Sequence, residues 1–467
     1  MKQSEVIERI ADFCNEDIDF DDATMEIAGM VFKDSLGCMI KSLDNAQCQK
    51  MLGPLENDNF KEDGVKIPGI DKPLNLLDAS WNIGVLIRWL DYNDCFLAEE
   101  WGHPSDNLGG ILAAALHLNK SEQNITVEDV LKYMIKAHEI QGVLSLSNSL
   151  NRNGFDHVFL VKLATAAVTA KMMGGDKEDI KDALANAFID AGPLRIYRHS
   201  PNVTARKSWA AGDATMRGVH LTLLSRKLHE NYGDILNEPV WGFNDVIMNG
   251  KEITLSRDLD SYVINNILFK AGFPAEFHAQ TAAEAAMSLH RKYKDRLDDI
   301  EEIKIETHES AIRIIAHKDK MTNPSDRDHS LEYIVAVSLL NGDLKTEYYY
   351  DEYHHNSPQI DELMKKMTVT EKQRYSEEYL EQDKRSIANS IQLVFKNGET
   401  SEEMEVEYPV GHKFRRDEVK PIIDQKFKDN LMSHFNESKT DELLNLFKDQ
   451  DDLKSLSINE FWEHWIS

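Results

Sequence analysis

The sequence contains only four cysteines, Cys14, Cys38, Cys48 and Cys95, and no two of them form a CxxC pair. Structural zinc sites and disulfide frameworks depend on paired or closely spaced cysteines, so the sequence disfavours both. Iron–sulfur enzymes also hold their clusters with cysteine thiolates, generally including a close pair. We therefore expect neither structural zinc nor an iron–sulfur cluster.

Long apolar runs are equally scarce. No stretch approaches the roughly 20 consecutive apolar residues that a membrane-spanning helix requires. Residues 1–10 alternate charged and apolar side chains at helical spacing, without the apolar run of a signal peptide or the arginine-rich pattern of a transit peptide. The expectation is a cytoplasmic protein.

Positive charge is also low. The chain has 53 Lys and Arg residues against 81 Asp and Glu residues, which gives a formal net charge of −28. An acidic surface repels nucleic-acid phosphates and anionic lipids, so we expect neither nucleic acid nor a membrane as a partner. It also repels a small carboxylate at long range. A site for such a substrate must therefore concentrate Lys, Arg and His locally.

Most of the first half of the sequence shows the apolar spacing of helices. At 467 residues the chain is long enough for two domains. Apolar residues recur at helical spacing in residues 22–43, 127–148 and 176–189, and most segments up to about residue 225 behave similarly. Residues 1–271 are therefore predicted to form a large all-helical domain.

The pattern changes after this helical part. Ile300, Ile303 and Ile305 approximate strand spacing. Residues 391–395 and 404–408 alternate in the same way on either side of Asn397-Gly398, which predicts a hairpin. Strands of this kind indicate a sheet in this region.

Helices accompany these strands, at residues 275–293 and 328–340, and residues 347–362 are predicted to be a mobile acidic loop. We therefore predict an inserted domain of sheet plus helices, residues 272–409. The C-terminal helices, residues 410–467, are expected to return to the helical domain. The predicted fold class is mainly α with a smaller α+β domain.

One polar and aromatic segment, residues 88–110, leads into an alanine-rich helix. Asp106 or Asn107 is a good N-cap, and Gly109 and Gly110 would let another chain or a ligand come close. The first N–H groups of such a helix favour a carboxylate, and His103 just upstream is placed to act as an acid or a base. The alternative interpretation is a tightly packed loop with a capped helix.

A second segment, residues 195–213, supplies local positive charge. Five cationic or potentially cationic side chains occur within thirteen of its residues. Arginine can hold a carboxylate with two parallel hydrogen bonds, and lysine supplies a compact charge. Arg206 and Lys207 are therefore candidates for binding carboxylates. Ion pairs with neighbouring acidic residues are an equally good interpretation.

Two further histidines stand at the starts of predicted helices. His157 ends a polar loop before an apolar helix, and His278 opens the first helix of the α+β domain. Either one alone is more often a hydrogen-bonded structural histidine than a catalyst. No role is predicted for a set of histidines in ordinary amphipathic helices, namely His138, His220, His229 and His290. The pair His354-His355 lacks a third ligand of matching spacing, so a solvated loop is preferred over a metal site.

These residue types suit a dehydration. Removing water from a β-hydroxy acid requires a base for the α proton, an acid for the departing hydroxyl, and cations that hold the charge building on a carboxylate. A metal is not needed if enough positive charge is preorganised. No GxGxxG, Walker or GxSxG motif occurs in a suitable context, which disfavours hydride transfer, phosphoryl transfer and triad hydrolysis.

Five segments carry a resemblance to a known family, and the likeness continues to residues 408–412 and beyond. The chain resembles the family that contains the 2-methylcitrate dehydratases and the cis-aconitate decarboxylases. The resembling segments are residues 90–94, 98–110, 135–142, 206–215 and 273–278.

This resemblance implies a helical domain plus a smaller α+β domain, a cofactor-free site between them, and a homodimer. Pocket residues of the decarboxylase branch match five positions here: Asp91, His103, His157, Lys207 and His278. The chain departs from the family at Cys95-Phe96, where Thr-Trp is common and the threonine is a pocket position in the decarboxylase branch. The departure bears on substrate preference and rate.

The hypothesis is a lyase that dehydrates 2-methylcitrate without an iron–sulfur cluster, in propionate breakdown, with citrate and cis-aconitate as further substrates. Lys207 and Arg206 would bind substrate carboxylates, Asp91 would orient His103, and the three histidines would transfer protons, with base and acid unassigned. Further substrate-binding candidates are Asn93, Asp94 and Ser105. The alternatives are a cis-aconitate decarboxylase that forms itaconate, and a non-catalytic member that binds a tricarboxylate.

Overall fold

The computed structural model describes residues 4–466 except 122–123, 200 and 319–320. The chain divides into two compact units. Unit 1 comprises Met1–Arg195, Ser208–Ile267 and Ile423–Ser467, and unit 2 comprises Ile196–Lys207 and Leu268–Ile422. The mainly α fold class with a smaller α+β part is confirmed. Unit 2 includes residues 196–207, which the predicted division at residues 271/272 had placed in the helical domain.

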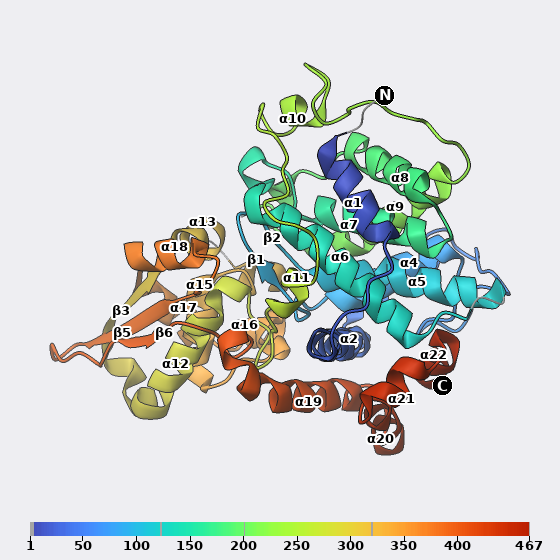
Figure 1. Cartoon of the computed structure of the whole chain (residues 1–467). Helices are drawn as coiled ribbons and strands as arrows, with labels where there is room; N and C mark the ends of the chain where they lie inside the picture. The colour runs from blue at the N-terminus through green and yellow to red at the C-terminus, as the bar shows by residue number, and fades with distance from the viewer. Residues whose placement is uncertain (1–3, 122–123, 200, 319–320, 467) are drawn as a thin grey trace. The chain divides into compact units, whose positions relative to one another are not determined.

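Unit 1 is built from helices and one short two-stranded sheet, β1 (Phe96–Leu97) against β2 (Trp101–Gly102) (Figure 1). Two longer helices contribute residues to both units, α9 (Arg206–Ser225) and α19 (Arg416–Met432). The remaining helices of unit 1 are α1 (Glu5–Asn15), α2 (Asp22–Ser42), α3 (Ala46–Gln49), α4 (Leu76–Arg88), α5 (Leu108–Leu118), α6 (Val127–Ser147), α7 (Val158–Met172), α8 (Lys177–Ile189), α10 (Phe243–Val246), α11 (Tyr262–Asn265), α20 (Glu437–Leu446), α21 (Gln450–Ser455) and α22 (Ile458–Ile466).

The helices predicted from periodicity are confirmed, and local capping explains where they begin. The Asp21 carboxylate accepts from the Thr24 N–H at the start of α2. Helix α6 begins with a capping box, in which Thr126 and Asp129 each accept from the other's backbone N–H. These side chains satisfy backbone donors that have no partner inside the helix.

Helix α5 lies unusually close to two other helices. A Cβ placed on Gly109 would lie 2.8 Å from the Cα of Gly84 in α4 and 2.6 Å from Cγ2 of Thr215 in α9. The Gly110 N–H also donates to the Thr215 hydroxyl at 2.8 Å. The prediction that these glycines admit a close neighbour is confirmed, and the neighbours are two helices of the chain itself.

Residues from Ile423 onward, which include most of α19 and the helices α20 to α22, belong to unit 1 and are red in Figure 1. The ring of Phe461 in α22 lies 5.5 Å from that of Phe32 in α2. The Lys426 ammonium of α19 forms an ion pair at 2.7 Å with the buried Asp34 carboxylate of α2. Residues from the two ends of the chain therefore share one core.

Unit 2 contains a four-stranded sheet in the order β4-β3-β5-β6 (Figure 1). Strand β3 pairs parallel with β4 and antiparallel with β5, and β5 pairs antiparallel with β6, which confirms the predicted hairpin. Helix α12 packs against β5 and β6, and α15 packs against α12. The strands are β3 (Ile300–Thr307), β4 (Met367–Glu371), β5 (Asn389–Phe395) and β6 (Met404–Val406), and the further helices are α12 (Gln280–Tyr293), α13 (Glu309–Ile315), α14 (Pro324–Arg327), α15 (Leu331–Asn341), α16 (Asp351–His355), α17 (Gln359–Lys365) and α18 (Gln373–Leu380).

The predicted acidic loop at residues 347–362 is wrong. A 3₁₀ turn (Thr346–Tyr349), α16 and the start of α17 occupy this stretch. Tyr349 and Ile360 are buried there, and the Tyr348 and Tyr353 rings lie 4.5 Å apart. The aromatic and aliphatic residues between the acidic ones therefore give this segment an apolar face of its own.

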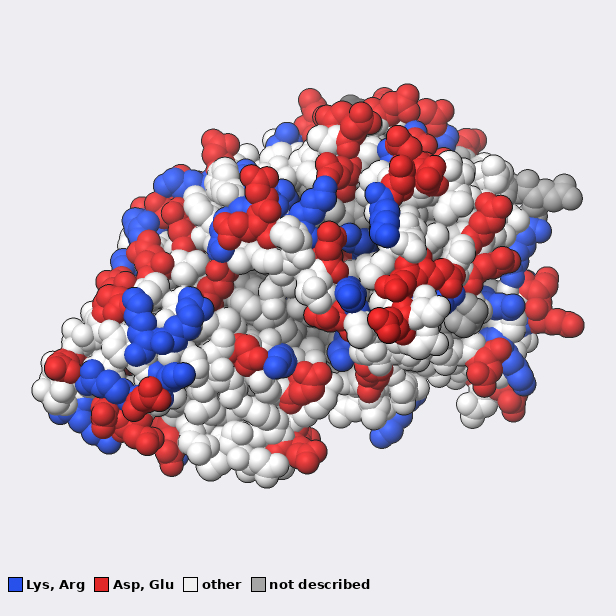
Figure 2. All heavy atoms as spheres, turned by 90° about the horizontal axis from the view of Figure 1, so that it is seen from below, with Lys and Arg blue, Asp and Glu red and all other residues white. Residues whose placement is uncertain are grey.

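Charged side chains of both signs are interspersed over the face drawn in Figure 2, so the net negative charge is not gathered into one block there. Within the described residues, no helix is long and apolar enough to cross a membrane.

Candidate active site

The first motif segment begins where α4 ends. Arg88, the last residue of α4, donates from Nη1 to the Asp91 Oδ1 at 2.6 Å, and both side chains are buried. Asp91 has a φ of +50°, a left-handed backbone conformation that L-residues rarely adopt. The ion pair thus holds a strained turn that directs the Asp91 carboxylate.

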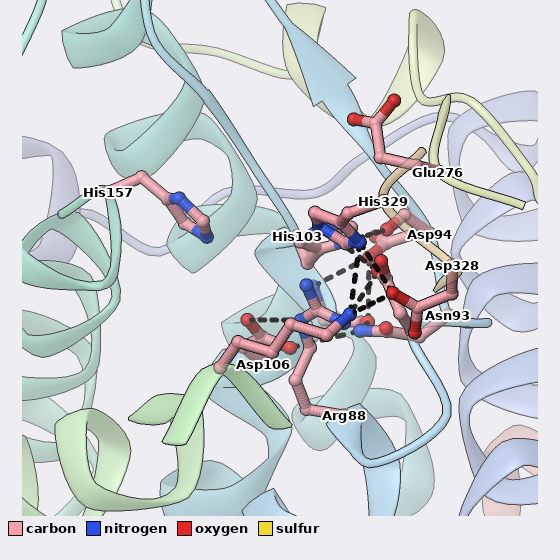
Figure 3. Close-up of polar contacts among 12 residues, drawn as sticks. Arg88, Asn93, Asp94, His103, Asp106, His157, Glu276, Asp328 and His329 are labelled. Carbon is pink, nitrogen blue, oxygen red and sulfur yellow. Dashed lines mark hydrogen bonds and ion pairs between the residues drawn. The ribbon is translucent and has the colours of Figure 1, made fainter. Parts of the chain in front are cut away.

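His103 lies beside this turn (Figure 3). Its Nδ1 is 2.6 Å from the backbone carbonyl oxygen of Asp94, which can only accept, so Nδ1 carries a proton. Its Nε2 lies 3.5 Å from the Asp91 Oδ1. The short hydrogen bond to the carbonyl of Asp94 therefore helps to orient the ring, and the orienting role predicted for Asp91 stays a prediction. The Asp91 carboxylate faces the other nitrogen.

Three predicted substrate-binding residues form a buried network with one another. Ser105 donates from Oγ to the Asp94 Oδ1 at 2.7 Å, and Asn93 donates from Nδ2 to Ser105 Oγ at 2.8 Å and to Asp106 Oδ1 at 3.0 Å. These contacts hold the loop that carries His103. We therefore assign a positioning role to Asn93, Asp94 and Ser105, and their direct contact with substrate stays a prediction.

His138 completes this network from α6. Its Nε2 lies 2.8 Å from the Asp94 Oδ2, and its Nδ1 lies 2.8 Å from the carbonyl oxygen of Met134. No catalytic role was predicted for His138, and its contacts are structural: the buried ring anchors Asp94, whose backbone carbonyl bonds to His103.

The N-cap predicted at the start of α5 is wrong, and the carboxylate site predicted there stays a prediction. Asn107 has helical backbone angles and makes no capping hydrogen bond, because a 3₁₀ turn (Pro104–Asn107) runs directly into the helix. The Leu108 N–H donates into that turn, and the Gly110 N–H donates to Thr215. These two donors are already used within the protein.

His157 lies near His103, with 6.0 Å between the ring centroids (Figure 3). Its Nδ1 is 3.4 Å from Nη1 of Arg195 and 3.5 Å from the Asp156 carboxylate. The Arg195 guanidinium in turn lies over the Trp101 ring, 4.8 Å from its centroid. Unit 1 therefore brings Asp91, His103 and His157 together and adds a buried arginine that was not predicted as a site residue.

Glu100 is a buried carboxyl group beside this arginine. Its Oε2 accepts from the backbone N–H and the side-chain amide of Asn151. Burial raises the pKa of Glu100 to about 7, although the Arg195 charge and the hydrogen bonds from Asn151 oppose this shift. Glu100 is thus a buried group that titrates near neutral pH.

This shift makes stability depend on pH. Between the ordinary pKa of 4.5 and about 7, the folded protein keeps a proton on Glu100 that the unfolded chain releases, so the free energy of unfolding falls as pH rises. Glu100→Gln cannot ionise at this position, so it lacks this fall in the free energy of unfolding. We expect its stability relative to wild type to increase by about 1–3 kcal/mol between pH 5 and pH 8, measured by urea denaturation. A difference independent of pH would contradict this assignment.

In unit 2, Lys207 is buried at the start of α9. Its Nζ donates to Asp328 Oδ1 at 2.6 Å and lies 3.0 Å from Nδ1 of His329. Arg206 places its guanidinium over the Tyr197 ring, 5.2 Å from the centroid. The interpretation of the basic segment as ion pairs thus holds for Lys207, which nevertheless keeps a buried positive charge in place.

His278 forms a second cluster in unit 2. Its Nδ1 lies 2.8 Å from Glu276 Oε1, and its Nε2 lies 3.2 Å from the Tyr379 hydroxyl. Burial would raise the pKa of Glu276, but the neighbouring His278, His329 and Lys270 outweigh it and lower this pKa to about 2. Glu276 is therefore an ionised partner of His278. The charge of His329 acts on it as well, which relates this cluster to that of Lys207.

The predicted residues therefore fall into two groups that the structure assembles within separate units. Each group includes partners that the sequence analysis did not select. Those partners are Arg88, Asp106, His138, Arg195, Glu276, Asp328 and His329. Four of them lay inside the chosen segments, namely Arg88, Asp106, Arg195 and Glu276, and Asp106 had been predicted only as an N-cap. The charged run at residues 326–329 was a signal for Asp328 and His329.

The four cysteines are buried, and none of them forms a disulfide. Cys95 directly precedes β1, and the Phe96 ring meets that of Tyr262 edge-on. Outside the gaps at residues 122–123, 200 and 319–320, residues 4–466 contain no group of three or more His, Cys, Asp or Glu side chains that could hold a metal ion.

Comparison with known proteins covers nearly all of the chain. Residues 8–256 match the MmgE/PrpD N-terminal domain, and residues 273–452 match the MmgE/PrpD C-terminal domain. The chain belongs to the MmgE/PrpD family. Most of its predicted site residues, including His103, His157 and Lys207, lie in the N-terminal match, and His278 lies in the C-terminal match.

Relatives within the MmgE/PrpD family are similar along most of their length. The 2-methylcitrate dehydratase of Escherichia coli K12 is 44% identical over 93% of this chain and 91% of its own length. The mitochondrial 2-methylcitrate dehydratase of Yarrowia lipolytica is 45% identical over 99% of this chain and 90% of its own length. The 2-methylcitrate dehydratase of Cupriavidus necator is 44% identical over 92% of this chain and 90% of its own length.

Proposed function

We propose that this member of the MmgE/PrpD family is a hydro-lyase that removes water from 2-methylcitrate to form 2-methyl-cis-aconitate, in propionate breakdown by the methylcitrate cycle. Relatives with the name 2-methylcitrate dehydratase support the substrate. The observation that carries the chemistry is the buried His103, whose Nε2 faces the Asp91 carboxylate.

In the proposed reaction His103 is the base. Because Nδ1 donates to the carbonyl of Asp94, the lone pair of the neutral ring lies on Nε2. The C–H bond next to a substrate carboxylate breaks, and its proton passes to Nε2. The Asp91 carboxylate, 3.5 Å away, stabilises the imidazolium that forms.

The reaction also needs an acid and fixed positive charge. The C–O bond to the neighbouring carbon breaks while the hydroxyl takes up a proton and leaves as water. His157 and His278 are the candidates for this acid. Lys207, which is buried, and Arg206, which is half-buried, are the proposed partners of the substrate carboxylates, since fixed cations lower the energy of the negative charge that builds during proton removal.

We further propose that this dehydration needs no iron–sulfur cluster. A cluster is held by thiolates, whereas the four cysteines here lie buried at scattered points of the sequence without a CxxC pair. The cationic and imidazole groups described above would stabilise the charge instead.

The test is an absorbance assay for alkene formation. The purified protein is expected to convert 2-methylcitrate, with citrate run in parallel, and to keep its activity after treatment with a chelator. Activity that is abolished by the chelator and restored by iron would overturn the cluster-free proposal. No turnover of 2-methylcitrate would overturn the assigned substrate.

The same experiment separates the alternatives. Incubation with cis-aconitate followed by NMR would reveal itaconate if the chain were a decarboxylase, and buried Cys95 stands where that branch has its pocket threonine. Calorimetric binding of a tricarboxylate without turnover of any substrate would indicate a non-catalytic member.

Two properties of the assembled protein are proposed with this function, a homodimer and a cytoplasmic location. Light scattering after size exclusion tests the first, and cell fractionation tests the second. The relative from Yarrowia lipolytica is mitochondrial, so recovery in a mitochondrial fraction is the alternative outcome to test.

A further inference from the structure

Unit 2 holds a buried histidine for which the proposed reaction has no use. His308 is fully buried, and neither of its ring nitrogens makes a hydrogen bond within the described part of the chain. Buried polar atoms are nearly always hydrogen-bonded, so this ring calls for an explanation. Burial, together with the neighbouring His278, holds the pKa of His308 well below its usual range, so the ring is uncharged.

The ring of His308 instead supports a tyrosine. It stacks on the Tyr379 ring with the centroids 4.8 Å apart and the planes 11° from parallel. The Tyr379 hydroxyl lies 3.2 Å from Nε2 of His278. Because His308 is neutral and hydrogen-bonds to neither group, it fixes the plane of the phenol without competing for a proton.

Tyr379 completes a chain of three groups. Glu276 Oε1 lies 2.8 Å from His278 Nδ1, and the phenol lies on the opposite nitrogen. A hydroxyl both donates and accepts, so it can donate to Nε2 of a neutral ring and accept from Nε2–H of a charged ring. A backbone carbonyl at the same place could only accept, so it would serve the charged ring alone.

We propose that Tyr379 is a positioning residue for His278, held in plane by His308, which keeps the imidazole in one orientation while its Nε2 gains and loses a proton. This inference rests on the proposed function, because it gives His278 a proton-transferring part in the dehydration.

Tyr379→Phe is the direct test, since it removes only the hydroxyl and keeps the aromatic ring on His308. We expect kcat for 2-methylcitrate to fall about tenfold, the value of one hydrogen bond, with KM nearly unchanged. Tyr375→Phe is the matched control, because Tyr375 is a buried tyrosine of the same helix whose hydroxyl lies 2.6 Å from Glu405. This control should keep the wild-type kcat.

A second measurement does not depend on turnover. In protein labelled with ¹⁵N at histidine, the His278 Nε2 resonance of Tyr379→Phe should move toward the position of a nitrogen without a hydrogen bond, while Nδ1 stays unchanged. His308→Leu, which removes the stacked plane, should give a smaller shift in the same direction.

The two measurements separate the possible failures. If wild-type protein does not convert 2-methylcitrate but the resonance moves, the proposed function fails and the positioning contact stands. If Tyr379→Phe retains both the wild-type kcat and the wild-type resonance, the positioning role is overturned. Circular dichroism and thermal unfolding establish that each variant is folded before these outcomes are compared.

Discussion

His103→Ala is expected to lower kcat for 2-methylcitrate dehydration by about 10²-fold or more, because it removes the base whose Nε2 faces Asp91. The loss should appear in kcat and in kcat/KM alike, since proton removal is an event of the transition state. Steady-state absorbance kinetics on folded protein measure both. The alanine leaves the Arg88–Asp91 ion pair in place, so the loop retains its anchor.

The control for this variant is His229→Ala. His229 is half exposed and lies 3.3 Å from the Asp182 carboxylate, so its loss should leave kcat at the wild-type value. A folded His103→Ala protein with wild-type turnover would remove His103 from the mechanism. Partial recovery of activity on adding imidazole would support its role as a base.

Lys426→Met is expected to lower the free energy of unfolding by about 3–5 kcal/mol, because it leaves the Asp34 carboxylate buried without its cation. Burial already raises the pKa of Asp34 against the opposing charge of Lys426. The lysine also donates to the carbonyl oxygen of Tyr92 at 2.7 Å, one residue after Asp91. Because this contact lies beside the Asp91 turn, turnover should decline as well. Urea denaturation measures the change in stability.

Lys33→Met provides a matched comparison for the same pair of helices. Lys33 of α2 pairs with Asp424 of α19 near the surface, where more than half of the aspartate is exposed, so its removal should change stability by only about 0–1 kcal/mol. The double variant Asp34→Asn, Lys426→Met should regain part of the loss. Equal effects of Lys33→Met and Lys426→Met would show that burial does not decide the strength of these pairs.

Local periodicity was enough to predict the long helices and the β5–β6 hairpin. Helices such as α2, α6 and α8 have stripes of apolar residues, and Asn397-Gly398 lies in the turn region between the paired strands. Strand β4 was missed although Met367 and Val369 alternate with threonines, because it has only five residues and its parallel pairing with β3 depends on tertiary structure. The acidic segment that proved helical was misjudged because charge was weighed above its spaced aromatic residues.

The site was predicted in its main residues but not in its contacts. Resemblance to a family identified His157 and His278 as site residues. Without it, their positions in the sequence had favoured structural roles. The partners lie far away in sequence, since His138 meets Asp94 across 44 residues and Lys207 meets Asp328 across 121. Such pairs are created by the packing of distant elements, and no local pattern specifies them.

The hydrogen bond from Lys426 to Tyr92 can form only late in the synthesis of the chain. It joins residues 334 positions apart, so at about 5–20 residues per second the ribosome needs roughly 20–70 s between synthesising one partner and the other. During that time the loop that carries Asp91 and His103 lacks one of its anchors, whereas residues 268–422 of unit 2 emerge as one continuous stretch. Residues 268–422 can therefore fold before residues 423–467 of unit 1 have been made, and the Asp91–His103 loop gains its contact with Lys426 only after that.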